Sequence, residues 1–228
     1  MAGFAGFPKA TTMFVRDLSA NNTKEWFQGH RDQYETYWLE PAKDFVAAAG
    51  AALRTIDRGI VAEARINGSI FRINRDVRFS KDKRPYKDHL DLWFWEGERK
   101  TAVSGYFFRL TPRSLGLGAG AHSFDSDRLA AYRGKVVDTL AGASLKRAVT
   151  TSERAGWQVE GEHYKRLPGG YDVSGAAAER LIRHNALWVG DDEPLPDVVF
   201  SPELVDHCLD RWRAAAPIHR WLVRELSS

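Results

Sequence analysis

The residues best suited to chemistry in this 228-residue chain lie in one segment, Arg72–Lys87, which reads RINRDVRFSKDKRPYK. A basic residue falls at every third position, and one more is added. The cations are Arg72, Arg75, Arg78, Lys81, Lys83, Arg84 and Lys87. Arginine suits bidentate recognition of phosphate, sulfate or carboxylate, and lysine adds a point charge. The pattern predicts an anion-binding site, with all of these residues except Arg84 as candidate ligand-binding residues.

Like charges packed this closely repel, and the protein can compensate for them in two ways. In one, the arginines pair internally with Asp76, Asp82, Asp88 and distant acids such as Glu25 or Glu35, which gives a structural salt-bridge lattice. In the other, a phosphorylated or otherwise anionic small ligand supplies the negative charge. Because two acids cannot neutralise seven bases locally, the ligand is the favoured interpretation.

Asp76 and Tyr86 are the two candidate catalytic residues of the segment. Asp76 lies between arginines, which favours its charged form, so it is a poor general base and suits orienting Arg75 or Arg78. Tyr86 has a lysine next to it and a second three residues before it; these favour its ionised form, and it could give a hydrogen bond or a proton to the anion. The alternative is that its ring packs behind the loop. Any reaction would be phosphoryl transfer or hydrolysis that relies on cationic stabilisation.

The distribution of charge bears on nucleic acid as a partner. Residues 65–87 contain eight Lys or Arg and two Asp, so the rest of a chain of net charge +3 sums to −3. This favours a local anion site over a surface that coats nucleic acid. A nucleic-acid-binding module is the second hypothesis, with Trp93 and Trp95 after the loop as stacking platforms. We expect weak or absent binding, because the acidic remainder repels a long polyanion.

Other classes of function have less support. The histidines are scattered without metal-ligand spacing, so we predict no metal site and no cofactor. His89 and Asp91 would share one strand face, which a solvated surface explains more simply. The single cysteine, Cys208, is expected to be a buried, inert thiol and fits a cytoplasmic protein. No run of eighteen apolar residues is present, so we expect no membrane association.

Helices and a small sheet must position the basic segment. Asn21–Asn22 are expected to cap a helix over residues 23–38, and Pro41 suits the first turn of the next helix. Pro85 removes an amide donor, so the basic segment itself should be an irregular, anchored loop. After it, three stretches alternate in polarity or are rich in glycine and predict an antiparallel sheet. They are residues 89–97, 101–111 and 114–122.

The second half of the chain returns to helix. Helices are expected over residues 126–142, near 176–185 and from Ser201 on, and Pro217 should bend or break the last one. No repeat or long linker divides the chain. The sequence therefore predicts one α+β domain over residues 1–228, in which N-terminal and C-terminal helices flank a small antiparallel sheet.

The basic segment also resembles the signature of an uncharacterised bacterial family, domain of unknown function 2461, with related regions in longer fungal proteins. The family pattern is Arg-x-x-Arg-Asp-x-Arg-Phe, followed by Asp/Asn-Lys and a tyrosine. The matching residues here are Arg72, Arg75, Asp76, Arg78, Phe79, Asp82, Lys83 and Tyr86. The stretches NNTKEWF, KRLPGGY and SPELVD are also similar, so the resemblance covers residues 11–228. It departs at Ala121-His122, where an aromatic is usual, and after PGGY, where DVSGAAAE replaces an Asp-His-Pro-like entry to a helix. The resemblance implies a fold and a site but no activity.

Overall fold

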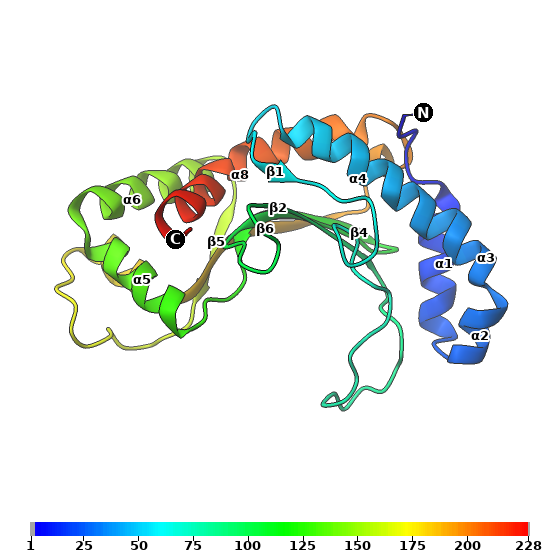
Figure 1. The fold of residues 1–228 in the computed structure, drawn as a ribbon, viewed down its shortest axis with the longest axis horizontal. Helices are drawn as coiled ribbons and strands as arrows, with labels where there is room; N and C mark the ends of the chain where they lie inside the picture. The colour runs from blue at the N-terminus through cyan, green and yellow to red at the C-terminus, as the bar shows by residue number, and fades with distance from the viewer. Residues whose placement is uncertain (1–2, 228) are drawn as a thin grey trace. The chain divides into compact units, whose positions relative to one another are not determined.

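A computed structural model describes residues 3–227 and has an α+β fold (Figure 1). Its six-stranded sheet has the strand order β1-β2-β3-β4-β6-β5. The strands are β1 (Ile60–Val61), β2 (Leu90–Glu96), β3 (Gly105–Leu110), β4 (Ser114–Ala121), β5 (Gln158–Glu162) and β6 (His184–Pro194). The predicted class, an antiparallel sheet flanked by N-terminal and C-terminal helices, is confirmed.

By its internal contacts the chain divides into two compact units. The first contains the described residues up to Phe94 together with Phe107–Leu117 and Asp192–Asp210. The second contains Trp95–Tyr106, Gly118–Asp191 and the described residues from Arg211 on. The division falls within strands β2, β3, β4 and β6, so no linker separates the units. The whole basic segment belongs to the first unit.

Short helical pieces dominate the first unit. They are α1 (Lys9–Ala20), α2 (Lys24–Gly29), α3 (Arg31–Gln33), the π-helical turn η1 (Tyr34–Leu39), α4 (Glu40–Leu53), the 3-10 turn η2 (Asp197–Phe200) and the start of α8 (Leu204–Leu226). The single helix predicted over 23–38 is thus three pieces. The predicted cap is also wrong, because the Thr23 side chain, and not Asn21–Asn22, accepts the Trp26 amide at 3.2 Å. Pro41 lies in the first turn of α4 as predicted.

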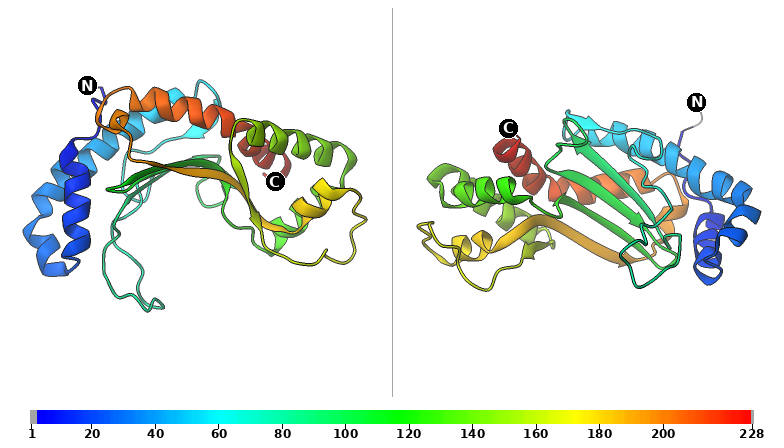
Figure 2. Two further views of the ribbon diagram at one scale, coloured as in Figure 1. Left: turned by 180° about the vertical axis from the view of Figure 1, so that it is seen from behind. Right: turned by 60° about the horizontal axis from the view of Figure 1, so that its bottom comes forward.

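An aromatic cluster joins the helices of this unit to its strands. The Phe45 ring on α4 lies 4.7 Å from the Phe108 ring on β3 and 5.5 Å from the Phe7 ring, and all three side chains are buried. Such tilted aromatic pairs add to the stabilisation from apolar burial. Figure 2 shows α4 running along the sheet. The cluster therefore packs α4 against one face of β3.

The second unit corrects two helix predictions. Its helices are α5 (Ser126–Val137), α6 (Thr139–Arg154), α7 (Ala176–Ile182) and the rest of α8. The helix predicted over 126–142 ends early, because Asp138 is extended and its side chain caps α6 by accepting the Leu140 and Ala141 amides at 2.9 and 2.7 Å. In addition, α8 begins at Leu204 and is not broken at Pro217.

Two expectations about single features can be compared with the structure. Cys208 is fully buried in α8, and burial raises the pKa of its thiol well above the ordinary value, as expected of an inert thiol. Among residues 3–227, no helix has both the length and the apolar character needed to cross a bilayer.

Asn22 ties the start of α2 to Tyr86 at the end of the basic segment. Its side-chain amide donates to the Tyr86 carbonyl at 3.0 Å, and its side-chain oxygen accepts the Tyr86 amide at 3.0 Å. The substitution Asn22→Ala leaves both partly buried backbone groups without these partners. We expect the free energy of unfolding to fall by about 2 kcal/mol in urea titrations, and amide exchange at Tyr86 to accelerate.

The neighbouring asparagine provides the matched control. Asn21 makes a single exposed side-chain bond to the Asp17 carbonyl at 2.9 Å. Asn21→Ala should change the free energy of unfolding by less than about 0.5 kcal/mol. Equal losses in the two variants would contradict the role given to Asn22.

Candidate functional site

The segment Arg72–Lys87, here called the basic arm, runs out from the start of β2 and doubles back (Figure 1). Its two sides are joined at the foot by backbone hydrogen bonds from Lys87 to Ile73 and from Arg75 to Pro85, both 2.8 Å. Between them Asn74 and Tyr86 form an antiparallel bridge. Residues 76–84 form the irregular tip. An irregular but anchored loop was predicted, and the foot of the arm supplies the anchor.

Two copies of one local arrangement stiffen the tip. In Asp76-Val77-Arg78, the carboxylate accepts the Arg78 amide at 3.2 Å and its guanidinium at 2.7–3.3 Å. In Asp82-Lys83-Arg84, the carboxylate accepts the Arg84 amide at 3.1 Å and its guanidinium at 2.8–3.1 Å. These bonds from Arg78 and Arg84 lower the pKa values of Asp76 and Asp82. The role predicted for Asp76, orienting an arginine, agrees with this geometry.

Apart from Lys87, which pairs with Asp91 at 3.1 Å, the remaining cations of the arm fall into three groups. Arg75 also pairs with Asp82 at 2.8 Å, so one carboxylate serves two guanidinium groups. The Lys83 ammonium donates to the Val77 carbonyl at 2.9 Å, which adds no negative charge. Arg72 and Lys81 are exposed and have no hydrogen bond or ion pair to any described residue. Internal pairing is therefore present, but it covers only part of the charge.

Tyr86 is held in the packed foot of the arm. Its ring is buried and stacks on Phe27 of α2, with ring centroids 4.3 Å apart. Burial, with a smaller effect of Glu25, raises the pKa of its phenol. The expected easing of its ionisation by the nearby lysines is therefore wrong, since Lys83 and Lys87 have other partners. The alternative prediction, a ring packed behind the loop, describes the geometry.

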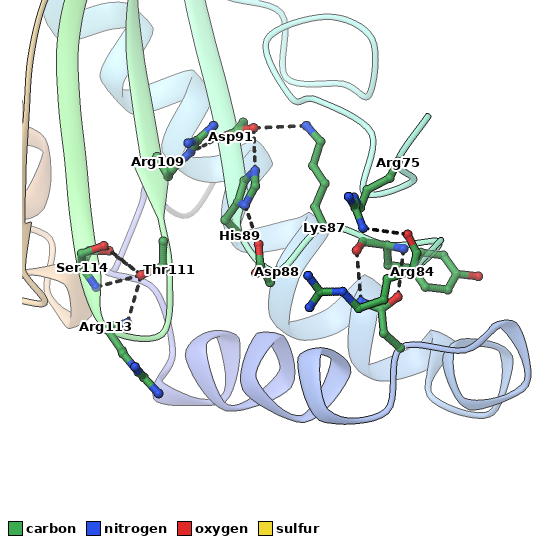
Figure 3. Close-up of polar contacts among 12 residues, drawn as sticks. Arg75, Arg84, Lys87, Asp88, His89, Asp91, Arg109, Thr111, Arg113 and Ser114 are labelled. Atoms are coloured by element: carbon green, nitrogen blue, oxygen red, sulfur yellow. Dashed lines mark hydrogen bonds and ion pairs between the residues drawn. The ribbon is translucent and has the colours of Figure 1, made fainter. Parts of the chain in front are cut away.

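A carboxylate at the start of the sheet is contacted by a lysine, an arginine and a histidine side chain, as Figure 3 shows. Asp91 on β2 accepts from Arg109 on β3 at 2.7 Å, from His89 at 3.0 Å and from Lys87 of the arm at 3.1 Å. The other ring nitrogen of His89 lies 2.8 Å from Asp88. Burial alone would raise the pKa of Asp91, but the bonds from His89 and Arg109 outweigh it and hold this pKa well below its usual range.

The sequence interpretation missed this Asp91 cluster, meaning Asp88, His89, Asp91, Lys87 and Arg109. It placed His89 and Asp91 on one face of a strand and treated that face as solvated, but His89 precedes β2, and its ring contacts the Asp91 carboxylate. A signal was available, since residues at alternate positions of neighbouring strands meet on one face. Arg109 on the second strand of the predicted hairpin could thus have been paired with Asp91. Within residues 3–227, no group of three His, Cys, Asp or Glu could hold a metal ion.

A hollow of about 320 Å³ lies beside the Asp91 cluster. It is lined by Arg16, Ser19, Asp88, Thr111, Pro112 and Arg113. The Thr111 hydroxyl fixes the β3–β4 turn by accepting the Arg113 and Ser114 amides at 3.0 and 2.9 Å. Figure 3 shows the Arg113 side chain extending from this turn. The hollow offers two guanidinium groups to an anion, but the Asp88 carboxylate opposes them.

The two tryptophans proposed as stacking platforms do not flank the arm as open rings. Trp95 is only 1% exposed, so that prediction is wrong for this residue. Trp93 is half-buried on β2, with its amide bonded to the Ser69 carbonyl at 2.9 Å. The most exposed aromatic side chain of residues 3–227 is instead Phe79, in the tip of the arm.

Comparisons with known proteins extend the resemblance without adding an activity. The family model described as "Conserved hypothetical protein (DUF2461)" matches residues 10–221. No curated protein and no solved structure matches the chain significantly.

The Asp91 cluster gives a prediction with a defined pH dependence. Asp91→Asn removes the negative charge that pairs with Lys87 and Arg109 and should lower the free energy of unfolding at pH 7 by about 2 kcal/mol. Because the folded pKa is depressed, the contribution is complete above the unfolded pKa of about 3.9 and is lost as the pH falls below it. In urea titrations, the difference in free energy of unfolding between wild type and variant should therefore be constant from pH 7 to pH 5 and smaller at pH 3.

Asp17→Asn is the control, because Asp17 is an exposed acid paired only with the adjacent Arg16. It should change the free energy of unfolding by less than about 0.5 kcal/mol at either pH. A gap for Asp91→Asn that stays the same at pH 3 would show that packing, rather than charge, explains the loss.

Proposed function

Since the chain belongs to the DUF2461 family, whose description names no activity, we propose a function from the geometry of the arm. The protein binds a phosphorylated or otherwise anionic ligand through the basic arm. The single cysteine is the reason to place this binding in the cytoplasm.

The observation that carries the proposal is the charge left over after internal pairing. Seven Lys or Arg against two Asp give Arg72–Lys87 an excess of five positive charges. Asp82 is shared by two arginines, and Arg72 and Lys81 have no hydrogen-bond or ion-pair partner in the described chain. Lys87 is paired with Asp91, an acid outside the arm. A multivalent anion would relieve the repulsion that remains.

The neighbouring hollow is a less favourable binding site for the same ligand. Arg16 is already bonded to Asp17 at 3.2 Å, and Asp88 contributes a carboxylate to the lining. An anion in the hollow would thus be repelled by Asp88, whereas Arg72 and Lys81 of the arm have no ion pair with any described residue. The charge balance favours the arm.

The proposal is one of binding. Tyr86 offers little as a proton donor, because its ring is stacked on Phe27 and the pKa of its phenol is raised. Asp76 is engaged with Arg78, and its pKa is lowered, which makes it a poor base. The two residues that were candidates for catalysis are better explained as supports for the shape of the arm.

The proposal predicts a thermal shift with pyrophosphate, used as a compact multivalent anion. At ten times its dissociation constant a ligand stabilises the folded state by about 1.4 kcal/mol, which raises Tm by about 3–6 °C for a chain of this size. The double variant Arg72→Gln, Lys81→Gln should lose most of this shift. Its Tm without ligand should not fall, because both side chains are exposed and unpaired.

Arg113→Gln is the matched control, since it removes an exposed arginine of the hollow and leaves the arm intact. It should keep the full shift with pyrophosphate. If Arg113→Gln removes the shift and the arm variant keeps it, the anion lies in the hollow and the proposal for the arm is wrong. Sodium chloride at equal ionic strength separates specific binding from screening.

A further inference from the structure

Phe79 is the most exposed of the large apolar side chains in residues 3–227. Its exposed fraction is 95%, whereas the other aromatic ring of the tip and foot, Tyr86, is 6% exposed. A ring kept in water contributes nothing to the apolar core. Single exposed apolar residues are common, but this one lies in the basic tip, next to Arg78 and two residues before the unpaired Lys81. The position of Phe79 therefore points to contact with something outside the chain.

The tip holds this ring in a defined place. The Ser80 amide donates to the Val77 carbonyl at 3.3 Å, and the Lys83 ammonium donates to the same carbonyl at 2.9 Å. Phe79 lies inside this turn in sequence, between the two Asp-x-Arg units. The Arg78 guanidinium, itself fixed on Asp76, is 5.8 Å from the Phe79 ring centroid. The tip is thus shaped from within, and little order has to be created when a partner binds.

We propose that the basic arm binds single-stranded nucleic acid, with a base stacked on Phe79 and the phosphates on the cations beside it. The inference rests on the proposed function, since it names the anion that the arm receives. Single-strand binders combine a positive track for the backbone with exposed aromatic rings on which bases stack. Arg72 and Lys81 are the unpaired cations for the phosphates. The charge distribution alone predicted weak binding of nucleic acid. The exposed Phe79 ring adds base stacking, which the charge distribution does not include.

A single strand fits the arm better than a duplex or an acidic protein. In a duplex the bases are already stacked, so Phe79 would have to wedge between them against the cost of unstacking. A duplex also brings denser charge towards a chain that is net acidic outside the arm. An acidic protein would satisfy the cations, but Phe79 would then need an apolar pocket in the partner. A single strand offers phosphates to the cations and unstacked bases to the Phe79 ring.

The test compares two labelled strands with the same number of phosphates, a twelve-nucleotide oligothymidine and an abasic strand of equal length. Fluorescence anisotropy at low salt should show the oligothymidine binding about tenfold or more tightly than the abasic strand. Phe79→Ala should lower affinity for the oligothymidine to that for the abasic strand, without changing the latter. Phe79→Trp should restore it, and Phe79→Leu, which lacks a π face, should not.

The salt dependence separates the two kinds of contact. Arg72→Gln should reduce the slope of log affinity against log salt by about 0.7, because one phosphate contact is lost, whereas Phe79→Ala should leave the slope unchanged. Because Phe79 is exposed, its variants should keep the wild-type Tm, which shows that any loss of binding is not unfolding.

Three results would overturn the inference. They are equal affinity for the abasic strand and the oligothymidine, tighter binding of a twelve-base-pair duplex than of the single strand, and equally tight binding of polyglutamate. In each of these cases the arm still binds anions, so the proposed function stands. If oligothymidine, the abasic strand, polyglutamate and pyrophosphate all fail to bind wild type, the proposed function fails together with the inference.

Discussion

The carboxylate of Asp91 is the point on which the basic arm depends. It is only 15% exposed, and a buried charge is costly unless it is paired and hydrogen-bonded. Its three donors come from three places: Lys87 from the end of the arm, His89 from the approach to β2, and Arg109 from β3. One acid thereby fixes where the arm leaves the sheet. Because Phe45 and Phe108 hold β3 from behind, the foot of the arm has a rigid base.

Acidic residues have different roles at the foot and in the tip of the arm. At the foot, one acid serves several cations and anchors the structure. In the tip, Asp76 and Asp82 each bind the amide and the guanidinium of the arginine two residues on. Such local turns shape the backbone, as acidic side chains do in Asx-turns. They leave most of the positive charge of the arm uncompensated, so the internal ion pairs do not rule out an external anion.

Much of the fold could be predicted because its signals are local. Alternation of polarity identified β2 and β3, a glycine-rich stretch identified β4, and Pro41 marked the start of α4. Where two local signals conflict, the prediction was wrong. The apolar spacing over 126–142 predicted one helix, but Asp138 ends the first helix and caps the next. The strand β6 was missed because its first residues continue a helical pattern from α7.

The site was predictable in its location but not in its contacts. The cations of the arm are visible in the sequence, but their partners depend on folding. The burial of Tyr86 requires Phe27, which lies far away in the sequence, and the pairing of Asp91 with Arg109 requires the register of two strands. Exposure is also a property of the folded chain: nothing local distinguishes Phe79, at the tip, from Phe71, before the arm.

The two aromatic rings of the arm, Tyr86 and Phe79, have opposite environments. Tyr86 and Phe79 lie seven residues apart, yet one is packed on Phe27 and the other is in water. Burying the first anchors the foot, with Asn22 bonding the same backbone from the other side. Nothing in the described chain covers the second, although the turn beneath it is held by Lys83 and Ser80. A tip that is ordered by internal bonds but leaves its ring and cations open is built for contact, because stability alone would favour covering the ring.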